Sequence, residues 1–102
     1  MQYPVTPDGR YFVVRGRLWR MANPSLGTDE RATLVAELMA ARRDLQVDRP
    51  ADVRAAAKAR VDRAKRGLGE RGAVWWTDGA PDYNRKLVKN SPYAEWFESV
   101  SG

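Results

Sequence analysis

Thirteen consecutive residues, Gly9 to Met21, constrain the fold of this chain more than any other stretch. They spell GRYFVVRGRLWRM, in which β-branched and aromatic side chains are interspersed with four arginines. Such residues suit a pleated, half-buried surface, and Gly16 lies where a tight turn or a bulge would be needed. The stretch predicts the main β element, as a hairpin turning at Arg15-Gly16 or as one bulged strand. In the hairpin, Phe12 faces Trp19, and Trp19 is expected to be buried against the helices.

Two amphipathic stretches follow and predict an antiparallel helical hairpin. The first runs from Asp29 to about Gln46, with Thr28 as its N-cap. Its apolar stripe consists of Leu34, Leu38, Ala41 and Leu45, widened by Val35 and Met39. The second begins at Ala51 or Asp52 and runs to about Arg66, with a glycine supplying the stop. Its alanine-rich face would allow close approach to the first helix.

Shorter elements are expected at both ends of the chain. Tyr3-Pro4-Val5 predicts a lead-in strand, and Gly72 to Trp76 could add one more strand. Prolines that suit a first helical position predict a short helix from Pro81 to about Lys89 and a last one from Pro92 to about Val100. The aromatic side chains of this last helix are expected to form a lid over the core.

The expected architecture is therefore α+β, with a small antiparallel β-hairpin or meander, a two-helix antiparallel hairpin and a short helical C-terminal segment. A chain of 102 residues predicts a single domain. Its parts would be a β region over 1–22, the helical hairpin over 28–68, and strand, turn and short helices over 70–102.

The residue types present narrow the available chemistry. The sequence contains neither cysteine nor histidine, which removes disulfides, thiolate nucleophiles, histidine-based triads and imidazole metal ligands. General acid–base work would fall to carboxylates, lysines or tyrosines. We expect no catalytic residues, no metal ligands and no cofactor, and an enzyme is the less favoured class.

The charge and hydropathy patterns indicate the kind of partner and location. The formal net charge is +5, and the positive excess lies in the hairpin and the helices, whereas residues 70–102 are slightly acidic. A basic protein attracts polyanions. No apolar run is long enough to span a bilayer, and MQYPVTPDGR lacks the features of a signal peptide. A cytoplasmic protein without membrane contact is expected.

Two blocks of the sequence carry a family resemblance. VTPDGRYFVVRGRLWRMANP, from Val5 to Pro24, and LGERGAVWWTDGAPDYNRKLVKNSPYAEW, from Leu68 to Trp96, resemble the two signature blocks of a family of short bacterial proteins. Some members carry a label linking them to Tol biopolymer transport, which nothing in this sequence supports. The family has no established activity, so the resemblance implies no catalytic residues.

The basic hairpin is the first candidate site. Arginines interleaved with aromatics on a sheet suit nucleic acid, because arginine holds phosphates and aromatic rings stack on bases. The alternative is a solvated strand face, and no named nucleic-acid motif is present. Basic residues on one flank of the second helix extend the candidate set, although charged helical faces are usually only solvated. The set is Arg10, Tyr11, Arg15, Arg17, Arg20, Arg54, Lys58 and Lys65.

Two further clusters are candidate sites. Arg31, Arg42 and Arg60 lie in or beside the apolar sectors of the helices, so they would either pair with carboxylates, for which Asp78 and Asp82 are the expected partners, or line an anion pocket. The segment WWTDGAPDYNRK offers a polar site, in which paired carboxylates could serve catalysis or hold a cation. Turn and capping duties explain the same residues. This polar set is Asp78, Asp82, Asn84 and Arg85.

Three functions follow in order of preference. The first is a non-enzymatic binding domain for an anionic partner, with nucleic acid foremost. The second is a protein-interaction or self-association domain that uses exposed aromatics such as Trp75, Trp76 or Trp96. The third is an enzyme or metal site at Asp78 and Asp82.

Overall fold

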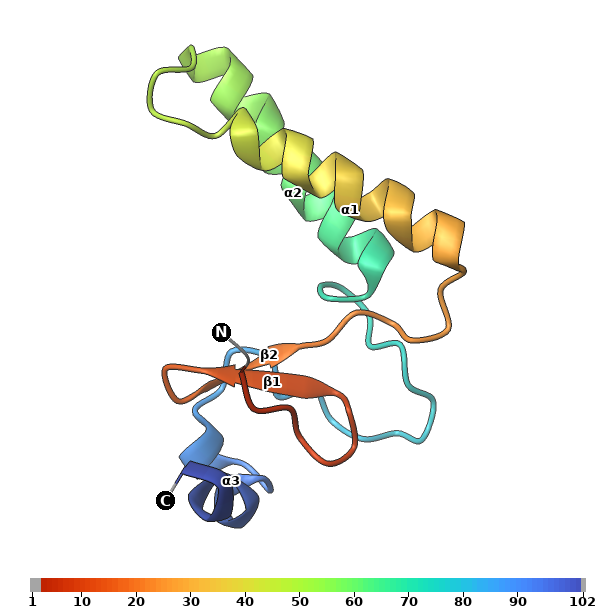
Figure 1. Cartoon of the computed structure of the whole chain (residues 1–102), viewed down its shortest axis with the longest axis vertical. Coiled ribbons are helices and arrows are strands. Elements are labelled where there is room, and N and C mark those ends of the chain that lie inside the picture. The colour runs from red at the N-terminus through yellow and green to blue at the C-terminus, as the bar shows by residue number, and fades with distance from the viewer. Residues whose placement is uncertain (1–2, 102) are drawn as a thin grey trace. The chain divides into compact units, whose positions relative to one another are not determined.

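The structure, a computed structural model, describes residues 3–101 and is a small α+β fold. Its chain forms two compact units. The sheet unit comprises residues 3–21 and 76–101, and the helical unit comprises residues 22–75. Figure 1 shows a strand pair with one short helix in the first unit and two long helices in the second. The α+β class is confirmed, whereas the single domain stays a prediction.

The Gly9 to Met21 stretch forms the predicted hairpin and not one bulged strand. Strand β1 (Tyr11–Val14) pairs antiparallel with β2 (Arg17–Arg20), and Phe12 lies opposite Trp19 as predicted. Arg15 and Gly16 form the turn with φ of 54° and 77°. Two successive positive φ angles are typical of a type I′ turn, whose twist matches that of the strands it joins.

A short extended segment lies along each edge of the hairpin. On the β1 side, a bridge joins Val5 to Phe12, so the lead-in strand is reduced to a single bridge. On the β2 side, a bridge joins Arg17 to Leu87, flanked by hydrogen bonds from Leu18 N to Lys86 O and from Val88 N to Gly16 O, at 2.9 and 2.8 Å. The two edges of the hairpin are thus covered by segments from opposite ends of the sequence.

The core of the sheet unit lies on the face of the hairpin that carries Tyr11, Val13 and Leu18, which are 0–3% exposed. The Tyr11 ring is in edge contact with the rings of Trp76, Tyr83 and Tyr93. Trp19 points to the other face and is half-buried, so the expectation that it would fill the core is wrong. Both faces are apolar in sequence, and the aromatic cluster around Tyr11 decides which one is covered.

In the helical unit, α1 (Thr28–Arg43) packs against α2 (Ala51–Leu68), which confirms the helical hairpin. Thr28 is the first helical residue and not the N-cap, a position taken by Gly27 without a side-chain hydrogen bond. Gly69 ends α2 with φ of 87°. The core is small, with Leu38, Ala64 and Leu68 at its centre and Ala22, Leu26, Leu34 and Val61 around it.

A backbone hydrogen bond joins the segment before α1 to the end of α2, and we name this junction the neck of the helical unit. The backbone N–H of Asn23 donates to the carbonyl of Leu68 at 2.7 Å. The chain therefore enters and leaves the helical hairpin at neighbouring points. Val35 and Met39 are 36% and 48% exposed, so they do not widen the buried stripe of α1 as predicted.

The segment after α2 differs from the prediction in two places. Residues 72–76 form no strand, because Gly72 has φ of 77° and the edge of β2 is taken by the segment around Leu87. Residues 81–87 form no helix, because the Asn84 N–H bonds the side chain of Asp82 and Arg85 has φ of 72°. A 3-10 turn, η1 (Val88–Asn90), and then α3 (Ala94–Ser101) follow.

The predicted C-terminal helix matches α3 closely, and α3 packs with η1. Tyr93, Trp96 and Phe97 are half-buried, and Tyr93 contacts the core ring of Tyr11. Among the helices of the described chain, none has both the length and the apolar composition that crossing a bilayer would require.

Candidate nucleic-acid interface

Two of the four hairpin arginines are structural. The Arg10 guanidinium forms an ion pair with Asp78 and lies 4.7 Å from the centre of the Trp76 ring. Arg20 is 2% exposed, lies 3.4 Å from the Asp82 carboxylate, and its backbone N–H donates to Asn84 Oδ1 at 2.9 Å. A buried arginine requires such partners, because an unpaired buried charge is costly. Both guanidinium groups are therefore engaged by carboxylates of the sheet unit.

Tyr11 must also be removed from the set of ligand-contacting residues. Its side chain is 0% exposed and its hydroxyl accepts the backbone N–H of Tyr83 at 2.8 Å. Burial raises the pKa of this hydroxyl above its ordinary value. A ring enclosed by other rings cannot stack on a base, so Tyr11 is a core residue.

The other two hairpin arginines, Arg15 and Arg17, are exposed. They lie beside three more exposed cations, because the segment after Asn84 pairs with the turn and with β2. The Arg17 guanidinium donates to the carbonyl of Arg85 at 2.9 Å, which fixes the two segments to each other. We name these five residues the tip cluster. Its members are Arg15, Arg17, Arg85, Lys86 and Lys89.

The tip cluster has no carboxylate partner in the part of the chain that the structure describes. Across residues 3–101, the carboxylates that form ion pairs do so with other arginines, and none is paired with a member of the cluster. In the same unit, Asp78 and Asp82 are taken by Arg10 and Arg20. Among the described residues, therefore, no ion pair neutralises the positive charge at the tip.

Two members of the cluster hold unfavourable backbone conformations. Arg15 and Arg85 are the non-glycine residues with positive φ in the described chain, at 54° and 72°. For an L-residue this region costs about 1–2 kcal/mol relative to the right-handed one. Asparagine or glycine occupies such turn positions with less strain. Backbone strain of this kind tends to occur at functional positions, and here both strained residues are cations of one cluster.

The sequence analysis assigned Arg15, Arg17 and Arg85 to candidate sites. Lys86 ends the polar segment WWTDGAPDYNRK but was left out of its set, and Lys89 was missed. The basic run NRKLVKN was a visible signal. The sequence did not reveal that this run pairs with the turn at Arg15-Gly16 and with β2, because a backbone bridge leaves no local pattern in the sequence.

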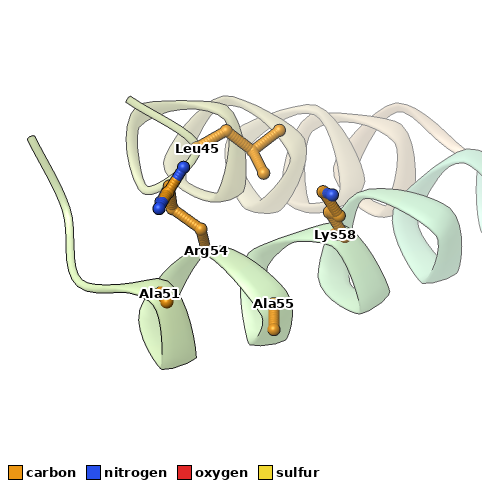
Figure 2. A pocket seen from close by; sticks show the side chains of 5 residues that line it. All are labelled: Leu45, Ala51, Arg54, Ala55 and Lys58. Carbon is orange, nitrogen blue, oxygen red and sulfur yellow. The ribbon is translucent and has the colours of Figure 1, made fainter. Parts of the chain in front are cut away.

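The candidate basic residues of α2 lie at a second location. Figure 2 shows the side chains of Arg54 and Lys58 on the side of α2 that faces α1, one turn apart, with Arg54 beside Leu45. With Leu45, Ala51 and Ala55 they line a pocket of about 370 Å³. The Arg54 Nε is buried and has no hydrogen-bond partner among the described residues. Lys65 lies about two turns further along α2 and does not line this pocket.

The three arginines proposed as an anion pocket do not converge. Arg60 forms an ion pair with Asp44 at 2.7 Å, which lowers the pKa of that carboxyl. Arg31 and Arg42 are exposed and three turns apart on α1. The expected partners, Asp78 and Asp82, pair with Arg10 and Arg20 of the sheet unit instead. The helical-wheel argument failed because the apolar stripe of α1 is narrower than predicted.

The polar site near Asp78 and Asp82 is structural as well. The hydrogen bond from Arg10 and that from the Ala80 N–H lower the pKa of Asp78, the opposite of what a general acid requires. Asp82 and Asn84 bond backbone N–H groups of Asn84 and Arg20. Within residues 3–101 no three acidic side chains gather as a metal site would need.

The aromatics assigned to an interaction surface are less exposed than expected. Trp76 is 8% exposed, and its Nε1–H donates to the carbonyl of Ala80 at 2.8 Å. Trp75 and Trp96 are half-buried. No protein-family model, curated protein or solved structure matches the chain. The resemblance to the short bacterial family thus stays a prediction.

Proposed function

We propose that this protein is a non-enzymatic nucleic-acid-binding domain that holds the phosphate backbone with its tip cluster. The observation that carries the proposal is that five exposed cations occupy two paired segments without a carboxylate partner among the described residues. Arginine donates to phosphate oxygens in a fork geometry, and lysine supplies a point charge. A strand-paired scaffold fixes their positions before the ligand arrives.

The strained turn supports the same conclusion. An Asn-Gly turn would satisfy the hairpin with less backbone strain than Arg15-Gly16. An arginine at this position therefore contributes something other than hairpin stability, and a cation at the apex is best placed to reach a polyanion. The proposal includes a cytoplasmic location, where such a domain meets nucleic acid.

The test is an anisotropy titration of labelled duplex DNA, single-stranded DNA and RNA at several salt concentrations. The double variant Arg15→Asn/Arg17→Gln removes two phosphate contacts. It should weaken binding to all sequences alike and flatten the slope of log affinity against log salt by about one to two units. Arg15→Asn keeps the turn, so loss of binding would not reflect loss of the hairpin.

The matched control is Arg42→Gln/Arg43→Gln, which removes the same two charges from exposed positions of α1. It should retain most of the affinity and the full salt slope. An equal loss in the control would show that only net charge matters and that the tip is not the site. Absence of binding to any of the three probes at low salt would overturn the proposal.

A further inference from the structure

The face of the hairpin opposite the core is the feature that bears on the class of nucleic acid. Alternation along β1 and β2 places Phe12, Val14, Arg17 and Trp19 on this face, and none of the four is fully buried. The edge bridges add Val5 and Leu87 in register with Phe12 and Arg17. We name this surface the outer face.

Aromatic rings lie on the outer face and not only in the core. Phe12 and Trp19 are directly opposite each other across the two strands. Tyr3 is 45% exposed, and its ring centre lies 6.2 Å from that of Phe12 at 39°. Three rings of this surface thus remain at least partly open to solvent in the folded chain.

Trp19 differs from Trp76 in a way that matters for binding. The indole N–H of Trp76 is satisfied by the Ala80 carbonyl. Among the described residues, Trp19 makes no hydrogen bond through its indole and no contact with another ring. The protein covers part of the Trp19 ring but leaves its indole N–H without a partner among the described residues, so the exposed part of this side chain can serve a ligand.

We infer that the outer face binds the bases of single-stranded nucleic acid, with the tip cluster holding the adjacent phosphates. The inference rests on the proposed function and deepens it by naming the strand state. Arg17 belongs to both surfaces, because it lies on the outer face and in the tip cluster. A backbone held at the tip would therefore direct its bases onto Trp19, Phe12 and Tyr3.

Charge and ring placement together favour a single strand over a duplex. In a duplex the base faces are stacked on one another and are closed to protein rings, whereas an unpaired strand exposes them. Base–aromatic stacking is tolerant of sequence, because every base has a π-face. We therefore expect little sequence preference and a clear preference for unpaired bases.

The experiment compares three probes of equal length, about 16 nucleotides, the upper end of site sizes for small single-strand-binding folds. They are oligothymidylate, an abasic oligonucleotide with the same phosphates, and a duplex. The full chain should bind oligothymidylate about tenfold or more tighter than the abasic strand, since one stacked base contributes this much. Trp19→Leu should reduce that ratio several-fold and leave the abasic and duplex affinities unchanged.

The controls distinguish base stacking on the outer face from phosphate binding by the tip cluster. Tyr11→Phe changes an aromatic of the core face and should leave the ratio unaltered. Equal affinity for the three probes would overturn stacking on the outer face while leaving phosphate binding by the tip intact. No binding to any probe would defeat the proposed function as well. Binding of oligothymidylate that Trp19→Leu does not alter would also overturn the inference.

Discussion

The two units of the chain use their cations in opposite ways. In the sheet unit, Arg10 packs on Trp76 and Arg20 is buried beside Asp82, so arginine belongs to the core. In the helical unit the core consists of small and aliphatic side chains. Ion pairs of this unit, such as Arg66 with Asp62 and Arg60 with Asp44, lie at partly exposed positions. Exposed ion pairs contribute little to stability.

This difference shows how a cation can be assigned to structure or to function. Within the sheet unit, the arginines that have carboxylates are those that close the fold, and the tip cluster is what remains. Composition alone does not separate the two groups, because Arg10 and Arg20 come from the same run of thirteen residues as Arg15 and Arg17. What separates the two groups is whether a carboxylate lies within ion-pair distance of the guanidinium.

The largest expected effect contrasts the two faces of the hairpin. Tyr11→Ala should lower the free energy of unfolding by about 3–5 kcal/mol, the range for emptying a core aromatic site. Trp19→Ala should cost about half as much, because Trp19 is only half-buried. Urea unfolding followed by circular dichroism measures both. A larger loss for Trp19 than for Tyr11 would reverse the assignment of the core face.

The next effect concerns the small core of the helical unit. Leu68 is 1% exposed at the end of α2, so Leu68→Ala should cost about 2–4 kcal/mol. Val47→Ala serves as the control, because Val47 is 88% exposed and should change stability negligibly. Similar unfolding midpoints for the two variants would mean that the helices do not depend on this core.

A smaller loss of stability is expected when the hydrogen bond between Tyr93 and Asp8 in the sheet unit is removed. The Tyr93 hydroxyl donates to Asp8 at 2.6 Å. Burial alone would raise the pKa of Asp8, but hydrogen bonds from Tyr93, Thr6 and the Arg10 N–H together lower it. Tyr93→Phe should therefore cost about 1 kcal/mol near neutral pH, which is below the usual value for a hydrogen bond to a charged group because Asp8 is exposed.

The stability that this hydrogen bond contributes should depend on pH in a characteristic way. A lowered carboxyl pKa stabilises the fold above the ordinary value of 3.8, and the contribution disappears as the pH falls through the folded-state pKa. Burial, together with the hydrogen bond to Asp8, raises the pKa of Tyr93 well above 10, so its contribution is complete below pH 10 and declines above it. Stability curves of the two proteins should converge in acid and again in strong alkali. A constant difference across the range would contradict the assignment.

The smallest expected effect has the opposite sign. Arg15→Asn relieves a positive-φ arginine and creates an Asn-Gly turn, so it should raise stability by about 0.5–1 kcal/mol. The tip would then be more stable and less able to bind nucleic acid. Thermal unfolding of this variant beside Arg17→Gln, which has no strain to relieve, measures the gain. A destabilised Arg15→Asn would show that the arginine side chain supports the turn.

The elements formed by local chemistry were predictable from the sequence. Gly16 marked the turn, and helical spacing of apolar residues marked α1 and α2. The covered face of the hairpin was not predictable, because Phe12 and Trp19 are as apolar as Tyr11 and Leu18. The choice depends on rings that arrive from residues 76–93.

The candidate site was predictable only in part for the same reason. Arg15 and Arg17 were assigned to it from the hairpin alone. The burial of Arg20 depends on Asp82, 62 positions away, and the presence of Lys86 at the tip depends on a backbone bond to Leu18. Pairing over such separations follows from the whole fold and not from spacing.

The closed neck of the helical unit has a consequence for the order of folding. The sheet unit cannot be completed until residues from both sides of the helices meet, and bringing distant segments together costs chain entropy. Once α1 and α2 pair, the bond between Asn23 and Leu68 shortens the open loop roughly fivefold, which reduces that cost by about 1.5 kcal/mol. The helices, whose contacts are local, should therefore form early. Their pairing speeds closure of the β-hairpin against the C-terminal segment, so destabilising variants at the helix pair should slow refolding of the sheet unit.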